Sequence, residues 1–139
     1  MAHFTESCTI YNFDGLIWQR TVLRGIMWRV SIDKAVTSNG IVNISGVANI
    51  TIPLNVKTTN NREYINSREY KELTDKSGYW TVNVEDNKDM IVLGEIINEI
   101  SSGYTISALR ADYENALIVK SLKDNTARDL LKHWQVGAK

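Results

Sequence analysis

The sequence predicts a mainly β fold, a small antiparallel β-barrel or sandwich with one or two short helices and a long polar loop. Three observations carry this prediction. Apolar residues recur at every second position in several stretches, turn signals separate those stretches, and only two short segments have helical spacing. With 139 residues, of which 43% are hydrophobic and 23% charged, the chain is expected to form one domain over residues 1–139.

The N-terminal part predicts two strands joined by a tight turn. Residues 8–13 form a short apolar stretch that ends at the turn signal Asp14-Gly15. Residues 16–32 alternate over the length of one long strand or a strand pair, with the even positions largely apolar. Gly25 lies in the middle of this stretch and predicts a bulge or bend, because glycine inside a strand usually marks one.

A second hairpin and a polar segment follow. The Asn-Gly pair within residues 38–40 predicts a hairpin turn, and residues 41–53 show the clearest alternation in the chain until Pro53 ends it. Residues 54–66 have little apolar pattern and contain four asparagines. We therefore expect residues 54–66 to form a long exposed loop.

The two helical segments begin with capping signals. Asn66 precedes a short segment with Glu69 three residues later, which is a variant of the capping box and predicts one or two helical turns. Residues 105–113 place Ile106, Leu109 and Tyr113 at helical intervals, with Thr105 or Ser102 as the cap.

The second half of the chain predicts four further strands between these helices and after them. They cover residues 79–84, 90–96, 116–122 and 130–136. In the last strand Leu130, Trp134 and Val136 share one phase, so Trp134 is expected in the core and the chain is expected to close with a hairpin. Residues 137–139 would then leave the barrel and form a short contact with a neighbour.

The sequence contains no pattern typical of an enzyme. No nucleophile elbow surrounds a serine and no glycine-rich phosphate loop is present. His3, His133 and Cys8 would form a metal site only if the tertiary fold assembled them. We therefore predict no catalytic residue, no metal and no cofactor, and an exposed side chain for His133, which alternates with Trp134.

The aromatic and cationic residues of the strands allow two interpretations each. The four tryptophans lie in strand phases and are expected to fill the core, although stacking on a ligand is the alternative. Arg20 and Arg24 share the phase of apolar residues. They are expected either to form salt bridges near a barrel rim or to lie in a subunit interface, where arginine is enriched.

The charge balance and the single cysteine favour some functional classes and cellular compartments over others. Sixteen basic and sixteen acidic residues cancel, which argues against a free-standing nucleic-acid binder and favours association with other proteins. The start of the chain lacks the features of a signal peptide, and no apolar run reaches the roughly 18–20 residues of a membrane span. The single cysteine fits a reducing cytosol.

Two sequence motifs carry a resemblance that extends over nearly the whole chain. The first is W-x-R-T-V followed by G-x-x-W, formed by Trp18, Arg20, Thr21, Val22, Gly25 and Trp28. The second is D-N followed by H-W-x-V-G-x-K, formed by Asp124, Asn125, His133, Trp134, Val136, Gly137 and Lys139. With these motifs the chain resembles a family of small neck proteins encoded among the morphogenesis genes of tailed phages and prophages of Clostridia and relatives.

More distantly, the chain resembles the head-closure or stopper proteins that join phage heads to tails. This resemblance implies a non-enzymatic subunit of a homo-oligomeric, hexameric ring in the virion neck, assembled in the bacterial cytoplasm without a membrane. The portal or adaptor ring would lie above it, the tail terminator or tail tube below it, and packaged double-stranded DNA would contact it without sequence specificity. A tail terminator or tail-completion ring is one alternative, and a monomeric β-barrel ligand-binding module is another of a different class.

The same resemblance implies two sets of functional residues. A channel loop would be polar without strong positive charge, which fits Lys57, Thr58, Thr59, Asn60, Asn61 and Arg62. The candidate contacts between subunits or rings are Arg20, Arg24, His133, Gln135 and Lys139. The helix before the last hairpin and the asparagine-rich loop depart from the stopper pattern, which keeps the tail terminator open.

Overall fold

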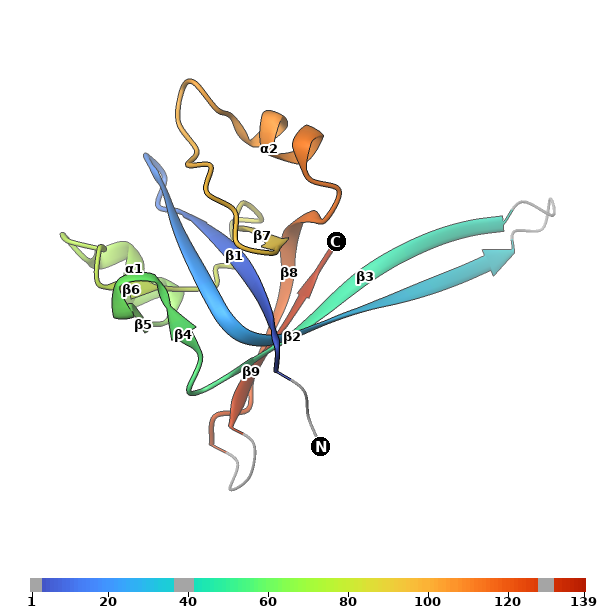
Figure 1. The fold of residues 1–139 in the computed structure, drawn as a ribbon, viewed down its shortest axis with the longest axis horizontal. Coiled ribbons are helices and arrows are strands. Elements are labelled where there is room, and N and C mark those ends of the chain that lie inside the picture. Colours follow the sequence, from blue (N-terminus) through green and yellow to red (C-terminus); the bar gives the residue numbers. More distant parts are fainter. Residues whose placement is uncertain (1–3, 37–41, 128–131) are drawn as a thin grey trace.

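A computed structural model of the protein describes residues 4–36, 42–127 and 132–139, with side chains described outside residues 31–46 (Figure 1). The predicted hairpin turn at residues 38–40 and the predicted core residue Leu130 lie outside the described residues. Among the residues described, no helix combines the length and the apolar character that a membrane span requires.

Within the described residues, six antiparallel strands close into a barrel. Their order around the barrel is β1 (Glu6–Phe13), β7 (Met90–Leu93), β8 (Ala116–Asp124), β9 (His133–Ala138), β3 (Val42–Pro53) and β2 (Trp18–Val36). The pairing of β1 with β2 closes the ring, and β4 (Lys57–Thr58) adds to β2. This architecture confirms the predicted mainly β class.

Two short strands, two short α-helices and a 3₁₀ turn at Thr59–Asn61 complete the fold. The strands β5 (Glu63–Tyr64) and β6 (Tyr79–Trp80) form a separate parallel pair. Helix α1 (Ser67–Glu72) lies between them, and α2 (Ile106–Asp112) precedes β8. Both predicted caps are confirmed, because the side chains of Asn66 and Thr105 accept hydrogen bonds from the N–H groups three residues later.

Gly25 forms the bulge predicted for the long second strand. Glu6 pairs with Ile26 and Ser7 with Arg24, so Gly25 is the extra residue, and its φ of +86° is readily adopted only by glycine. The bulge moves the inward-facing side of β2 from odd to even positions, because Leu23 and Ile26 both pack in the inner core. The single apolar phase predicted for residues 16–32 is therefore wrong before Gly25.

The core has two layers on either side of the barrel wall. The inner layer contains side chains from all six strands, including Ile10, Leu23, Ile50, Ile91, Val119 and Val136. The outer layer lies between α2 and the outer face of β1, β7 and β8, and contains Tyr11, Met90, Val92, Leu109 and Ala116. Trp28, Trp80 and Trp134 are buried as predicted, whereas Trp18 is half-buried against the outer layer.

The predicted strand over residues 79–84 is shorter than expected. Only Tyr79 and Trp80 belong to a strand, although the residues that follow, up to Asn83, are still buried. In place of a neighbouring strand, Asn12 hydrogen bonds to the backbone of Thr81, and Asp89 accepts from the N–H of Asn83. Side chains thus form the hydrogen bonds with this buried backbone that a neighbouring strand would otherwise form.

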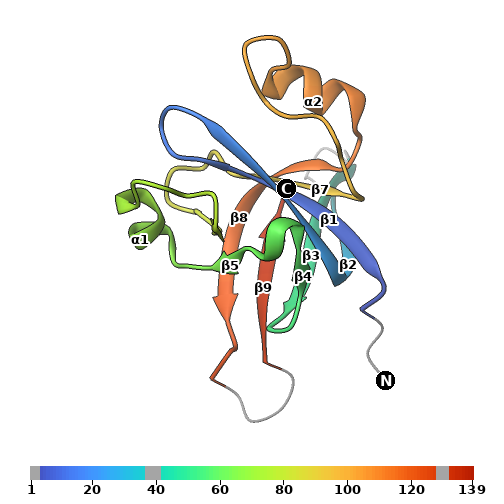
Figure 2. The same ribbon diagram turned by 60° about the vertical axis from the view of Figure 1, so that its left-hand side comes forward.

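The C-terminal strand is a central part of the barrel. Figure 2 shows β9 running between β8 and β3, with which it pairs on its two sides. Gly137 and Ala138 belong to this strand, and Lys139 exchanges two backbone hydrogen bonds with Ile118. The prediction that residues 137–139 leave the barrel is wrong.

Candidate functional site

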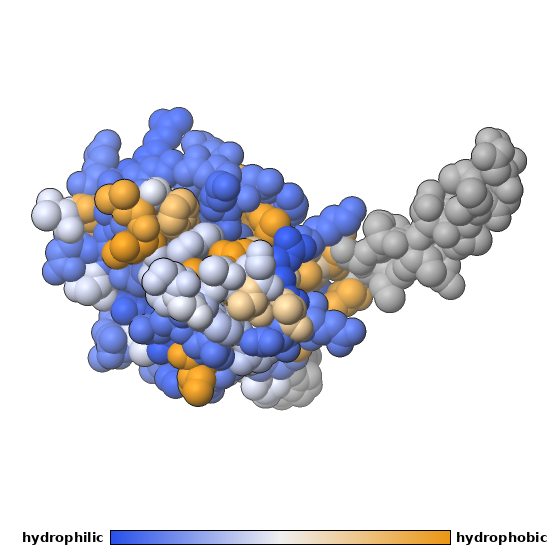
Figure 3. Space-filling model, turned by 90° about the horizontal axis from the view of Figure 1, so that it is seen from above, coloured by the Kyte–Doolittle hydropathy of each residue, from blue (hydrophilic) through white to orange (hydrophobic). Residues whose placement is uncertain are grey.

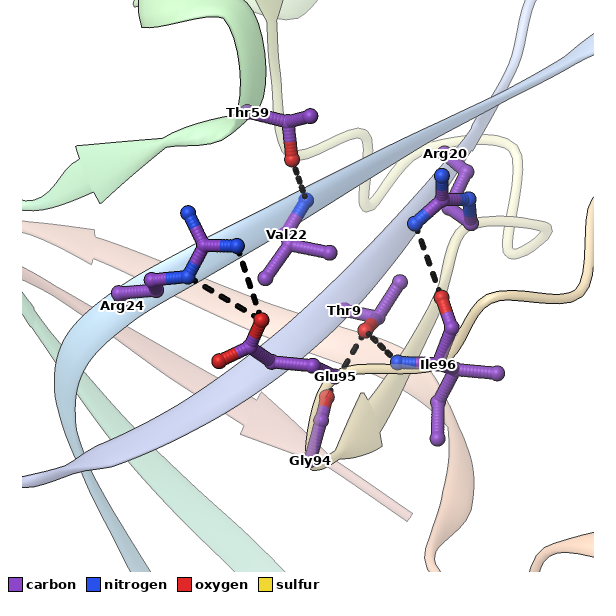
Figure 4. A network of polar contacts seen from close by, with 8 residues as sticks. All are labelled: Thr9, Arg20, Val22, Arg24, Thr59, Gly94, Glu95 and Ile96. Atoms are coloured by element: carbon purple, nitrogen blue, oxygen red, sulfur yellow. Dashed lines mark hydrogen bonds and ion pairs between the residues drawn. The ribbon is translucent and has the colours of Figure 1, made fainter.

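The predicted channel loop is attached to the barrel through strand β2. Its first two residues, Lys57 and Thr58, form β4 and pair with Arg24 and Leu23 of β2. The hydroxyl of Thr59 then accepts a hydrogen bond of 2.9 Å from the N–H of Val22 (Figure 4). These contacts place the loop along the outside of β2.

The tip of this loop is a tight turn of two asparagines. Asn60 and Asn61 both have φ values in the left-handed region, 58° and 53°, which asparagine adopts more readily than most residues. The hydroxyl of Thr58 donates to the carbonyl of Arg62 at 2.8 Å and closes the turn. The exposed members of the predicted channel loop are Lys57, Asn60 and Asn61.

Arg62 fastens the far end of the loop. Its Nη1 donates to the carbonyl of Arg20 and, at 2.9 Å, to the hydroxyl of Thr21, and its Nε donates to the carbonyl of Ser77 at 2.9 Å. Burial lowers the pKa of the Arg62 guanidinium from its ordinary value. Most of its donors are therefore used within the subunit, so Arg62 positions the loop and offers little to an outside partner.

Arg20 and Arg24 hold the segment that follows β7. Arg24 forms an ion pair with Glu95, with Nη2 and Oε1 2.9 Å apart, and the hydrogen bond raises the pKa of Arg24. Arg20 Nη1 donates to the carbonyl of Ile96 at 2.9 Å, and Figure 4 shows both arginines reaching toward the same short segment. The predicted salt bridge is confirmed for Arg24, and a subunit contact through either arginine stays a prediction.

The C-terminal candidates differ in exposure. His133 is buried, with 8% of its surface exposed, and its Nε2 lies 3.2 Å from Nδ2 of Asn125. The prediction of an exposed His133 is wrong. Alternation with Trp134 indicates only that the two side chains point to opposite faces of β9, and at this position both side chains are buried. Gln135 is half-buried, and Lys139 is exposed.

An exposed apolar groove lies at the tip of the β1–β2 hairpin. Leu16 and Ile17 are 89% and 66% exposed there, although the hairpin carries them at the end of two core strands. The groove has a volume of about 450 Å³. Its lining residues, which define the hairpin-tip groove, are Phe13, Leu16, Ile17, Trp18, Ile100, Ser101, Ser102, Thr105 and Ile106.

The hairpin turn itself keeps these apolar side chains in place. Asp14 Oδ1 accepts hydrogen bonds from the N–H groups of Leu16 and Ile17 at 2.8 and 2.9 Å. Next to the turn, the rings of Phe13 and Trp18 pack with their centroids 4.7 Å apart. Figure 3 looks down on the end of the molecule that carries this hairpin and α2, and hydrophobic side chains gather there in patches between hydrophilic ones. The groove is thus a firmly held surface feature.

This groove is not among the sites that the sequence predicts. Its one local signal was the apolar run Leu16-Ile17-Trp18 directly after a turn, where polar residues are usual. The other wall of the groove comes from residues 100–106, which are distant in the sequence. Only the packing of α2 beside the hairpin brings the two walls together.

A second pocket, of about 380 Å³, lies beside the aromatic residues of the inner core. Tyr64, Trp80 and Trp134 pack against one another there, with ring centroids between 4.5 and 5.7 Å apart. Both tryptophans are almost fully buried, which fits the predicted core role better than stacking on a ligand.

The side chains that commonly bind metal ions form no cluster among the residues that the structure describes. In the described part of the chain, no group of three His, Cys, Asp or Glu residues could hold a metal ion. Cys8 is fully buried, and burial raises the pKa of its thiol, as expected for a cysteine that acts as a small core residue.

Comparison with known proteins gives a family without an assigned activity. Residues 3–139 match the model of a family described as a family of unknown function, DUF6751. No curated protein and no solved structure matches the chain.

Proposed function

We propose that this chain, which belongs to the DUF6751 family, is a non-enzymatic structural subunit that assembles with copies of itself into a ring in the neck of a tailed-phage virion. The observation that carries the proposal is the hairpin-tip groove. Exposed apolar surface of this kind costs free energy in water and typically marks a protein–protein contact. The sequence resemblance to phage neck proteins supplies the assembly in which such a contact would be used.

The ring is proposed to be the head–tail stopper, which joins the DNA-filled head to the tail and helps to retain the DNA. The exposed loop tip supports this role chemically, because Lys57 supplies one positive charge beside the amides of Asn60 and Asn61. So small a positive charge would contact DNA phosphates weakly and without reading bases. The portal or adaptor ring and the tail terminator or tail tube are the proposed neighbours.

The groove also favours a second candidate function, a monomeric ligand-binding module. Its volume of about 450 Å³ is within the range of small-molecule sites, and its walls combine apolar side chains with a few hydroxyl groups. The two functions differ in what covers the groove. A second protein would cover it in a ring, whereas a small apolar ligand would occupy it in a monomer.

Native mass spectrometry of the purified protein tests the ring directly. We expect a closed oligomer, a hexamer in the simplest case, whose mass is a multiple of the 15.8 kDa subunit. A protein that stays strictly monomeric at micromolar concentration would exclude the ring and favour the ligand-binding module. Addition of a fluorescent apolar probe then shows whether the groove of such a monomer takes a small ligand.

Electron microscopy of particles assembled without the protein separates the two neck rings. Loss of a stopper should produce filled heads that leak DNA beside unattached tails of normal length. Tails of abnormal length would instead identify a tail terminator and contradict the stopper.

A further inference from the structure

The ribbon formed by β2 and β3 extends beyond the barrel without further strands. β1 and β4 pair with β2 only as far as Ile26, and β9 pairs with β3 only from Ala48 onward. The rest of the ladder, residues 29–36 paired with residues 42–49, continues to the pair Val36 and Val42. In this part of the ladder, beyond Ala48, neither β2 nor β3 pairs with a third strand among the described residues. We call residues 29–36 and 42–47 the arm, and Figure 1 shows it projecting from the barrel.

The arm continues a face of the sheet that is apolar inside the barrel. Trp28 and Ile50, which pair with each other, are buried in the inner core. The next position of the same phase on β2 is Val30, which is 57% exposed although Trp28 is only 8% exposed. On β2 the cover provided by the barrel therefore ends between Trp28 and Val30, whereas on β3 the partner of Val30, Ala48, is still buried.

The register places further apolar residues along this phase of the arm. They are Ile32 and Val36 on β2, and Val42 and Ile44 on β3, with Lys34 and Gly46 between them. A two-stranded ribbon is at best marginally stable alone in water, and an unpaired strand edge readily associates with another chain. The arm thus has the composition and the free edges of a segment that is completed by another molecule.

The arm and the hairpin-tip groove lie on opposite sides of the molecule. In Figure 1 the arm extends to the right, whereas the tip of the β1–β2 hairpin points to the upper left. An arm that leaves the barrel in this direction reaches the groove of a neighbour and not its own. Contacts between two different surfaces of identical chains repeat from copy to copy and close into a ring when the rotation permits.

The size of the arm is sufficient for such a contact. Eight residues at about 3.3 Å each give a ribbon about 26 Å long and about 10 Å wide. Covering one face and one edge removes about 500 Å² from the arm and a similar area from the groove, and the sum of about 1,000 Å² reaches the lower bound of specific interfaces. Each subunit of a ring makes two such contacts.

We propose that the arm of one copy of this chain lies in the hairpin-tip groove of the next copy. This inference rests on the proposed ring and names the contact that builds it. The occupant of the groove is a β-ribbon of an identical chain, which covers Leu16 and Ile17 with apolar residues and gains cover for its own Val30.

Two variants, one on each surface, test the proposal. Leu16→Asp with Ile17→Asp changes the groove, and Val30→Asp changes the arm. All three side chains are more than half exposed, so thermal melting should show that both variants fold. Each variant alone is expected to lose the oligomer and to run in native mass spectrometry at the monomer mass of 15.8 kDa.

Mixing the two variants gives the decisive measurement. The groove variant keeps an intact arm and the arm variant keeps an intact groove, so one contact can form between them and no more. The mixture is expected to contain a heterodimer of twice the monomer mass and no ring. The matched control is Leu54→Asp, which places a charge at a half-exposed leucine away from the groove. This variant should assemble like the wild type.

Each of the other possible results refutes one part of the proposal. Rings that persist in both variants would refute the arm and groove as contacts while the ring itself stands. A mixture that stays monomeric would show that the two surfaces do not meet each other. Loss of assembly in Leu54→Asp as well would show that the effect is not specific to the groove, and a monomeric wild type would refute the ring and this contact together.

Discussion

At the scale of single residues, Asp89 places a carboxyl group in the interior of the protein. Its buried carboxylate accepts hydrogen bonds from Asn12 Nδ2 at 2.7 Å and from the N–H groups of Phe13 and Asn83 at 3.0 Å each. Burial raises its pKa from the ordinary 3.8 to about 6, although these three donors lower it. The carboxylate connects β1 to the irregular segment after β6 and replaces a strand at that point.

We expect Asp89→Asn to lower the free energy of unfolding by about 1–3 kcal/mol at pH 7.5, because an amide group would face backbone N–H donors that need acceptors. Urea denaturation measures the difference. Glu85→Gln is the matched control, since Glu85 is an exposed carboxylate in the neighbouring turn and should change stability little. An unchanged stability of Asp89→Asn would contradict the structural role of the carboxylate.

The raised pKa of Asp89 also predicts a pH dependence. Between about pH 4 and pH 6 the folded protein holds a proton on Asp89 that the unfolded chain has released. The contribution of this residue to the free energy of unfolding therefore falls as pH rises, by up to about 1.4 kcal/mol per pH unit. The deficit of Asp89→Asn relative to the wild type should accordingly be larger at pH 4.5 than at pH 7.5. A deficit that is constant with pH would show that Asp89 titrates normally.

At the scale of elements, the bulge at Gly25 determines the course of β2. The strand pairs with β1 up to Ile26 and with β3 from Met27 onward, and the inward-facing side of the strand changes at Gly25. One glycine thus allows a single strand to contribute to the barrel wall and then to continue into the arm. A regular strand of the same length would place Leu23 or Ile26 on the wrong side of the wall.

We expect Gly25→Ala to lower the free energy of unfolding by about 1–2 kcal/mol, because a φ of +86° is strained for any residue with a Cβ atom. Space is not the cause, since the added Cβ would lie 3.6 Å from the carbonyl of Phe4, an ordinary contact. Gly78→Ala is the matched control, because nothing lies within 4 Å of its added Cβ. Equal stability of the two variants in thermal denaturation would argue against the strained bulge.

At the scale of the whole molecule, the last strand closes the barrel. Ala138 is fully buried and pairs with Ala48 on one side and Val119 on the other, although it is the second residue from the end of the chain. The hydrogen bonds between Lys139 and Ile118, at 2.9 and 3.2 Å, extend this pairing to the last residue. Gly137 and Ala138 are therefore part of the barrel wall, and Lys139 is held to it through its backbone, while its side chain is exposed.

Deletion of residues 137–139 is expected to lower the free energy of unfolding by about 3 kcal/mol or more, because several buried hydrogen bonds worth about 1 kcal/mol each are lost together with the side chain of Ala138. Urea denaturation of the shortened chain measures this loss. Lys139→Ala keeps the backbone pairing and should be close to the wild type. A shortened protein as stable as the wild type would show that these residues form a tail that contributes little to the barrel.

Much of the secondary structure was predictable because its causes are local. The alternation of residues 41–53 identifies β3, and the side chains of Asn66 and Thr105 mark the starts of both helices, since a cap bonds only to an N–H three residues away. The glycine bulge was predictable for the same reason. The reversal of the inward-facing side at Gly25 was not, because both phases of β2 contain apolar residues and only pairing with β1 selects between them.

The order of residues along the chain thus determined the mainly β class, the positions of most strands and the two helix starts. The tertiary structure decided which surfaces are available to partners. It buried His133, fastened Arg62 to β2, placed Gly137 and Ala138 in a central strand and joined the two walls of the hairpin-tip groove. Periodicity reports which way a side chain points relative to its own strand. Exposure depends on what another segment, distant in the sequence, places in front of that side chain.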